Sequence, residues 1–159
     1  VGFAMGMTAE EIAVGIAQYK TVGRRGAVTD TGYICLVDDC YNSNPDSLKC
    51  AIDSLLLMPG RHVCILADML EQGEDSARIH YEVGEYAREK GIELVAAYGP
   101  KSLETCRAVG ERGVHFETKE LLAAAISELI RKGDAVLVKA SLGMHLEDIS
   151  ELLKTLQET

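Results

Sequence analysis

Features that mark several large classes of protein are missing from this sequence of 159 residues. Basic side chains are outnumbered, because 16 lysines and arginines stand against 25 aspartates and glutamates and leave a net charge of -9. Proteins that bind nucleic acid or anionic lipid rely on basic patches, so this balance argues against both partners. No apolar run approaches the roughly 20 residues of a membrane span. The start also lacks the basic segment of a signal peptide, and we expect a cytoplasmic protein.

Motifs for metals and for common nucleotide chemistry are also absent. The five cysteines form no CxxC pair, and four lie in or beside apolar segments, which is typical of reduced, buried thiols in a cytosolic protein. The histidines show no ligand spacing, so we expect no metal site. There is no GxxxxGK phosphate loop, GxGxxG, GxSxG or HExxH. Without a phosphate loop, this chain alone is not expected to turn over ATP.

The sequence does contain an alternation of helical patterns with near-continuous apolar strands. We predict strands at residues 33–38, 62–67, 93–98, 114–116 and 135–139, separated by helices. Such an alternation is typical of a parallel sheet with helices on both faces. A turn at Thr31 and Gly32 adds one antiparallel edge strand. We therefore predict a doubly wound, Rossmann-like α/β domain with a mostly parallel sheet.

The first 23 residues differ from the rest. Thr8 and Glu11 form a capping box before a helical pattern, and a glycine-rich linker follows at residues 22–26. Position 1 is not Met, and we expect the chain to be a fragment. Residues 1–23 are predicted to belong to another domain, and residues 24–159 to form the α/β domain.

Polar side chains follow the predicted strands where each strand ends. Ligands bind beyond the carboxyl ends of the strands in open parallel sheets, so these side chains are expected to converge on one rim. The chief candidates are Asp39, Asn42, Asn44, Asp68, Lys139 and Ser141. The cluster suits a phosphorylated or multiply hydroxylated ligand.

Structural interpretations of the same residues stay open. Asn44 before Pro45 fits a helix N-cap, and Asp68 could be a loop acid. Lys139 ends a buried strand, where a lysine is costly without a partner, which favours a functional role. His80 lies inside a helix among apolar neighbours, and we expect it to be structural.

Four segments of the chain together resemble the C-terminal domain of a Mur ligase, of the MurF type. They are VDDCYNSNPDSLKCAIDSL, MPGRHVCILADMLEQG, HYEVGEYAREKGIE and DAVLVKASLGMHLEDI. The family pattern is roughly DD-x-YNANP-x-S, GDM-x-ELG, H-x-x-VG-x-x-A and LVKGSR-x-x-x-ME. The match runs in order from about Arg24 to the end of the chain. Residues 1–23 resemble the last helix and hinge of the family's central ATP-binding domain.

The resemblance implies an ATP-dependent ligase that adds D-alanyl-D-alanine to the UDP-N-acetylmuramoyl tripeptide in peptidoglycan synthesis. In such ligases ATP, with Mg²⁺, phosphorylates the carboxylate of the UDP-sugar peptide, and the dipeptide amine attacks the acyl phosphate. The C-terminal domain closes over the enzyme's own central and N-terminal domains, which assembles the site and excludes water. By this resemblance we expect a monomer that is inactive alone and holds no bound cofactor.

The same resemblance implies a role for each candidate residue. Those on the nucleotide side are Arg24, Asp39, Tyr41, Asn42 and Asn44. Arg24 would be the interdomain arginine and Asp39 the acid that binds the ribose hydroxyls. Asp68 and Ser141 would face the incoming dipeptide and the acyl phosphate, where Lys139 would counter negative charge.

The chain departs from the family pattern at three positions. Ala67 and Ala140 replace glycines, which is a small change. Leu142 replaces the arginine of KGSR, and this removes a planar cation near an anionic substrate. The loss of this arginine leaves open whether position 142 contacts the substrate or whether the parent enzyme is active.

Three alternatives remain at this point. A related ligase of the folylpolyglutamate or cyanophycin synthetase type shares the fold and the placement of Asp39. A response-regulator receiver domain also has a strand ending in two acids, an acid after a later strand and a lysine at the end of the last strand. Here these would be Asp38 with Asp39, Asp68 and Lys139. The third alternative is a stand-alone nucleotide-binding module.

Overall fold

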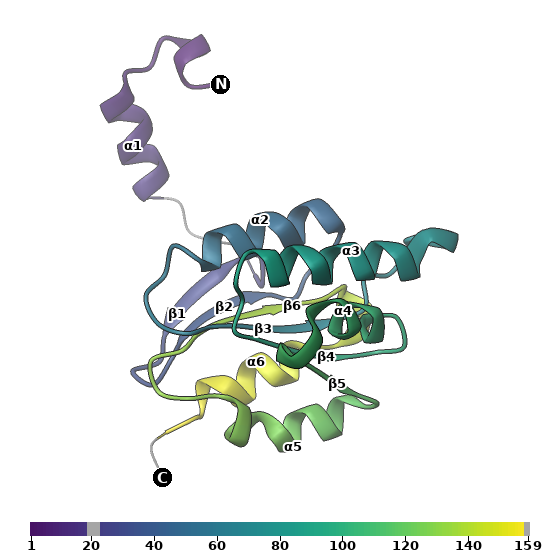
Figure 1. Ribbon diagram of the computed structural model, residues 1–159. Coiled ribbons are helices and arrows are strands. Elements are labelled where there is room, and N and C mark those ends of the chain that lie inside the picture. The colour runs from purple at the N-terminus through teal and green to yellow at the C-terminus, as the bar shows by residue number, and fades with distance from the viewer. Residues whose placement is uncertain (19–22, 158–159) are drawn as a thin grey trace.

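A computed structural model describes residues 1–18 and 23–157 of the chain (Figure 1). Within them, six strands form one sheet in the order β1-β2-β6-β3-β4-β5. The strands are β1 (Ala27–Asp30), β2 (Cys35–Asp39), β3 (His62–Ala67), β4 (Leu94–Tyr98), β5 (Gly113–Phe116) and β6 (Ala135–Lys139). Only β1 runs antiparallel to its neighbour. The predicted mostly parallel sheet with one antiparallel edge strand is confirmed.

Helices cover both faces of this sheet (Figure 1). One layer is α2 (Pro45–Leu55), α3 (Ser76–Glu89) and α4 (Ser102–Val109), and the opposite layer is α5 (Lys119–Leu129) and α6 (Glu147–Lys154). Side chains alternate along a strand, so β6 supplies both layers. Leu137 packs in the core beneath α2 and α3, and Val138 packs in the core beneath α5 and α6. The doubly wound arrangement is confirmed.

The observed strands begin and end within two residues of the predicted bounds, and the largest shift has a local reason. The strand predicted at residues 33–38 is observed at Cys35–Asp39. Thr31 delays its start, because the Thr31 Oγ1 atom accepts a hydrogen bond from the backbone of Ile34 at 3.0 Å and extends the turn. The next helix begins at Pro45 after an Asn44 cap, as expected, and ends at Leu55.

The N-terminal segment contains a short 3-10 turn, η1 (Phe3–Met5), and α1 (Ala9–Ala17). Its capping box is confirmed: Thr8 Oγ1 accepts from the Glu11 backbone, and the Glu11 side chain accepts from the Thr8 backbone. No residue of 1–18 is buried, and Val14 and Ile16 are 57% and 69% exposed. Residues 19–22 lie outside the described residues, and residue 22 is the first of the predicted linker at 22–26. The division into residues 1–23 and 24–159 stays a prediction.

The place of β6 separates this fold from the receiver domain. β6 is the last strand along the chain but lies between β2 and β3, the first two parallel strands. A receiver of the flavodoxin-like type has its five parallel strands in the order 2-1-3-4-5, with the last strand at an edge. The receiver alternative does not fit.

No helix among the described residues is long and apolar enough to cross a membrane.

Candidate functional site

The carboxyl ends of β2, β6 and β3 meet at one edge of the sheet, which we call the rim. Asp39 at the end of β2 is the register partner of Lys139 at the end of β6. Lys139 is in turn the partner of Leu66 in β3, two residues before Asp68. The predicted convergence of these polar residues therefore follows from the insertion of β6 between two earlier strands.

The side chains of Asp38 and Asp39 lie on opposite faces of the sheet because side chains alternate along a strand. Asp38 is 4% exposed, and its Oδ2 atom accepts from the Arg24 guanidinium at 2.8 Å. The same guanidinium donates to Glu151 of α6 at 2.8 Å. Arg24 is thus held on the α6 side of the sheet, and the structure does not bring it to Asp39. Its predicted contact with a nucleotide stays a prediction.

Lys139 is a buried lysine whose charge is paired. Its side chain is 2% exposed, and its ammonium donates to Asp39 Oδ2 and, at 2.8 Å, to the backbone carbonyl of Asn42. These contacts answer the question that the sequence raised, namely what partner makes a lysine tolerable inside the sheet. The Asp39 side chain keeps 21% exposure.

Residues 41–44 form the loop that follows Asp39. The Arg25 guanidinium stacks on the Tyr41 ring, 3.7 Å from its centroid. The Asn42 side chain accepts from the backbone of Ser43, and Asn44 caps α2 by accepting from Ser47 at 2.9 Å. The structural interpretation of Asn44 is therefore confirmed by its contacts, and the two asparagines shape the loop.

A cleft of about 380 Å³ lies beside this loop, between β1, β2 and α2. It is lined by Arg25, Gly26, Val28, Val37, Asp39, Ser47, Cys50, Ala51, Ser54 and Met58. Sequence analysis found Asp39 but missed Arg25. The available signal was an arginine next to the predicted hinge, together with a tyrosine two residues after Asp39 on which an arginine can stack.

A second hollow of about 170 Å³ lies on the rim between the loops after β3 and β6. Its lining residues are Tyr41, Asn42, Leu70, Glu71, Ser141, Leu142 and Gly143. The Ser141 hydroxyl joins the two loops by accepting from the Leu70 backbone at 3.0 Å. Glu71 adopts a left-handed backbone conformation, with φ of 63°, which a residue with a side chain rarely takes outside special sites.

Asp68 is brought close to the rim but has partners of its own. It is 3% exposed and accepts hydrogen bonds from the backbone of Lys101 at 3.1 Å and of Ser102 at 2.7 Å. These donors belong to the first turn of α4, so the carboxylate satisfies a helix N-terminus. Gly99 makes room for it, because a Cβ there would lie 2.5 Å from Asp68 Oδ1. A contact between Asp68 and a dipeptide stays a prediction.

His80 is also engaged within the fold. Its Nε2 atom accepts from the Met69 backbone at 2.9 Å, and its Nδ1 atom lies 2.7 Å from the Ser76 carbonyl. One acceptor and one donor nitrogen describe a neutral imidazole. These bonds agree with the structural role expected for it.

The three departures from the family pattern occupy two environments. Ala67 and Ala140 are 3% and 0% exposed, and both methyl groups pack in the core beneath α5 and α6. Leu142 is 53% exposed and lines the rim hollow. The two alanines are therefore packing changes, whereas the leucine alters a surface that a ligand can reach.

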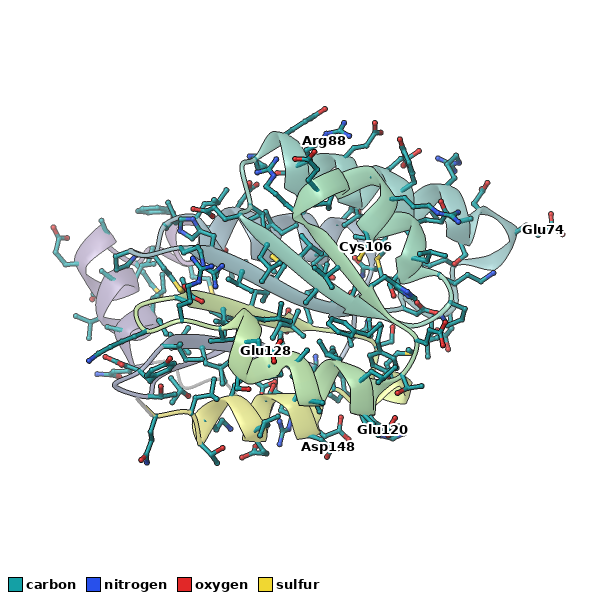
Figure 2. The ribbon with its side chains drawn as sticks, turned by 60° about the horizontal axis from the view of Figure 1, so that its bottom comes forward. Glu74, Arg88, Cys106, Glu120, Glu128 and Asp148 are labelled. Atoms are coloured by element: carbon teal, nitrogen blue, oxygen red, sulfur yellow. The ribbon has the colours of Figure 1, made fainter. Side chains whose placement is uncertain are left out.

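All five cysteines are free, but they are not all buried as the sequence predicted. Burial raises the pKa of the Cys40 and Cys64 thiols to about 12 and that of Cys106 to about 11. Cys106 lies on α4 facing the sheet (Figure 2). Cys35 is partly exposed and Cys50 is exposed on α2, because Cys50 lies on the side of the helix that faces the cleft. Among the described residues, no three His, Cys, Asp or Glu side chains are grouped to hold a metal ion.

Comparisons with known proteins bear on this site. The family model of the Mur ligase, glutamate ligase domain, matches residues 23–142. The chain is 34% identical over 163 residues to the UDP-N-acetylmuramoyl-tripeptide–D-alanyl-D-alanine ligase of Escherichia coli K12, covering 99% of this chain and 35% of that protein. The ligase of the same name from Bacillus subtilis strain 168 is also 34% identical, over 93% of this chain and 34% of that protein.

A solved structure gives the same likeness in three dimensions. The MurF ligase from Thermotoga maritima, in complex with ADP, superposes with a TM-score of 0.80 at 27% identity. The superposition covers 96% of this chain and 35% of that one. The chain thus spans about a third of the length of the relatives that it matches.

Proposed function

This chain belongs to the Mur ligase family through its glutamate ligase domain, and we propose that it is the C-terminal domain of an enzyme that joins D-alanyl-D-alanine to UDP-N-acetylmuramoyl tripeptide. The observation that carries the proposal is 34% identity along 99% of the chain to a ligase of that name. Neither the related ligases nor a stand-alone nucleotide module is favoured by these likenesses. The reaction consumes ATP and a UDP-sugar, and we place it in the cytoplasm.

Residues 1–23 are, in this proposal, the last helix and hinge of a central domain. The support is the exposure of apolar side chains along this segment, with Phe3 and Met5 at 73% and 76% and Ile16 at 69%. Apolar side chains in such a row are usually covered by a partner surface. The rest of the same enzyme would supply that surface, together with the phosphate loop that this sequence lacks. The chain alone would then be a monomer without ATPase activity.

The cleft beside Asp39 suits the sugar of a nucleotide. Bound ATP, with Mg²⁺ held outside this chain, would supply the phosphoryl group that activates the peptide carboxylate. Asp39 would accept hydrogen bonds from the ribose hydroxyls, since only one of its oxygens is engaged by Lys139 and its side chain reaches solvent. Tyr41, Asn42 and Asn44 would shape the loop on this side. Arg24 would reach the nucleotide only after leaving Asp38 and Glu151.

The rim hollow suits the incoming dipeptide. Ser141 lines it and holds the loops after β3 and β6 together. Asp68 supports the same region from behind by fixing the start of α4. Closure of this domain over the other two would bring the dipeptide amine to the activated carboxylate and exclude water from the acyl phosphate.

A chimera tests the proposal. This chain replaces the matching C-terminal third of the Escherichia coli relative, and the chimera is assayed for D-alanyl-D-alanine-dependent release of phosphate from ATP and for the mass of the product. We expect joining of the dipeptide to the UDP-sugar tripeptide, and none from the chain alone. A folded chimera that joins glutamate to a folate, and not the dipeptide, would instead support the folylpolyglutamate alternative.

A further inference from the structure

The family resemblance implies an electrostatic role for Lys139 at the acyl phosphate, but the contacts favour a different one. We propose that Lys139 is a positioning residue, which fixes Asp39 and the loop of residues 41–44 for nucleotide binding and does not touch the reacting groups. This inference rests on the proposed function, because it takes Asp39 as the residue that binds the nucleotide. It rests equally on geometry that is independent of that function.

The first argument is the burial of the lysine. Lys139 is 1% exposed, and the five residues of β6 are all buried. A buried ammonium is tolerated only when its charge and its hydrogen-bond donors are satisfied within the protein. Two of its three donors are used by Asp39 and by the Asn42 carbonyl. To reach a phosphate in the cleft, the ammonium would have to leave both partners.

The second argument is what those two partners have in common. Asp39 is the last residue of β2, and Asn42 lies in the loop that follows it. One ammonium therefore joins the end of β2, the loop after it and the end of β6. Because Asp39 and Lys139 are register partners on adjacent strands, the backbone sets the distance between them. This arrangement fixes one Asp39 oxygen and leaves the other for a ligand.

The chain contains a matched control, Lys119. Its ammonium also donates to one carboxylate, that of Asp148, and to one backbone carbonyl, that of His145 at 3.0 Å. This pair lies on the outer side of α5 and α6, where Figure 2 shows Asp148 projecting into solvent. Lys119 does not line the cleft or the rim hollow. Lys119 therefore has the same kinds of partner as Lys139 but lies away from the cleft and the rim hollow.

The experiment compares four variants in the active chimera: Lys139→Met, Asp39→Ala, the double variant, and Lys119→Met. We expect Lys139→Met to raise the KM for ATP about tenfold, as the loss of a charge-assisted hydrogen bond predicts, with kcat changed by less than about twofold. In the double variant, KM should be no higher than in Asp39→Ala alone. Lys119→Met should change neither constant.

Two outcomes would overturn the proposal. A fall in kcat at unchanged KM would assign Lys139 to the chemical step or to folding alone. If the KM of the double variant rose by the product of the two single effects, Lys139 would act without Asp39. If Lys139→Met does not fold, Lys139→Gln, which keeps an N–H donor, is judged by the same criteria.

A second measurement separates this inference from the proposed function. An inactive chimera with the native chain would count against the proposed function and would leave Lys139 to be tested in the chain alone. There, Lys139→Met should shift the backbone amide resonances of residues 42–44, and Lys119→Met should not. Unshifted resonances in the folded Lys139→Met chain would overturn the positioning role.

Discussion

Two ion pairs lie at opposite ends of this sheet and differ in which partner is buried: the carboxylate in one and the cation in the other. The basal pair, Arg61 with Asp134, lies where β3 and β6 begin, and the rim pair, Lys139 with Asp39, lies where β6 and β2 end. Asp134 is 2% exposed, and both of its oxygens accept hydrogen bonds from Arg61, at 3.0 and 2.7 Å. The Arg131 backbone adds a third donor at 2.8 Å.

In the rim pair the cation is buried, and the carboxylate is the partner that reaches solvent. One Asp39 oxygen accepts from Lys139, and the side chain keeps 21% exposure. A carboxylate whose acceptors are all used can only hold the structure together, whereas one with an accessible acceptor can still bind a ligand. The difference follows the polarity of the strands, because parallel sheets place ligands at their carboxyl ends. We therefore expect the basal pair to govern stability and the rim pair to govern binding.

The largest effect is expected at the basal pair. Arg61→Met leaves the Asp134 carboxylate buried with one backbone donor, and breaking a buried pair in this way costs about 3–5 kcal/mol, or about 10 °C in Tm. Chemical denaturation and thermal unfolding of the chain measure it. Lys139→Met should cost less, because the Asp39 carboxylate that remains can be hydrated.

An exposed pair provides the baseline for that measurement. Arg78 pairs with Glu82 on the surface of α3, and Arg78→Met should leave the unfolding midpoint where it is. If Lys139→Met proved as destabilising as Arg61→Met, the division between a structural pair and a binding pair would be wrong.

The next effect concerns binding at the rim. Asp39→Ala in the chimera should raise the KM for ATP about tenfold, because a carboxylate acceptor for the ribose hydroxyls is lost. The same change leaves the buried Lys139 ammonium with the Asn42 carbonyl as its remaining partner, so the isolated chain should also lose stability. An unchanged KM for ATP would remove Asp39 from the nucleotide site and leave the rim pair with a structural role only.

The two pairs also show which features of the structure could be predicted from the sequence. Apolar runs and Gly, Pro and Asn signals predicted the strands and helices, because these patterns are local. The pairing of Asp39 with Lys139 could not be predicted from the residues, since it depends on β6 entering the sheet beside β2, across a separation of one hundred residues. The sequence placed a polar cluster at the rim but not its internal contacts.

The prediction of other residues in the candidate site was limited in the same way. Arg24 and Arg25 are adjacent in sequence, yet one is held by Asp38, and the other lines the cleft and stacks on Tyr41. Nothing in composition or spacing separates them. Asp68 was chosen for its position after a strand, and its carboxylate proves to be occupied by the start of α4, which is a tertiary contact.

Thiol labelling compares the rim with the interior of the sheet by their local stability. Cys40 directly follows Asp39 at the rim, and Cys64 lies within β3; burial raises the pKa of both thiols to about 12. The thiolate is the reactive form, so labelling near neutral pH requires a local opening that exposes the thiol. Because the rim consists of loops, Cys40 should react about tenfold faster than Cys64 under native conditions.

Mass spectrometry after treatment with a maleimide gives the order of modification. Exposed Cys50 should be modified first in every sample and serves as the internal standard. Equal rates at Cys40 and Cys64 would mean that the rim opens only when the whole domain unfolds, and that the rim is no less stable locally than the interior of the sheet.

The smallest effects distinguish two neighbouring positions on the rim itself. Ala140→Gly removes a fully buried methyl group and should cost about 1 kcal/mol of stability, whereas Leu142→Arg changes an exposed side chain and should stay within about 0.5 kcal/mol. In the chimera, Leu142→Arg adds a cation to a hollow whose charged lining residue is Glu71, so it should lower the KM for the dipeptide carboxylate and leave the KM for ATP unchanged. A change in the KM for ATP instead would show that the hollow and the cleft beside Asp39 form one site, and that the rim cannot be divided into a nucleotide side and a dipeptide side.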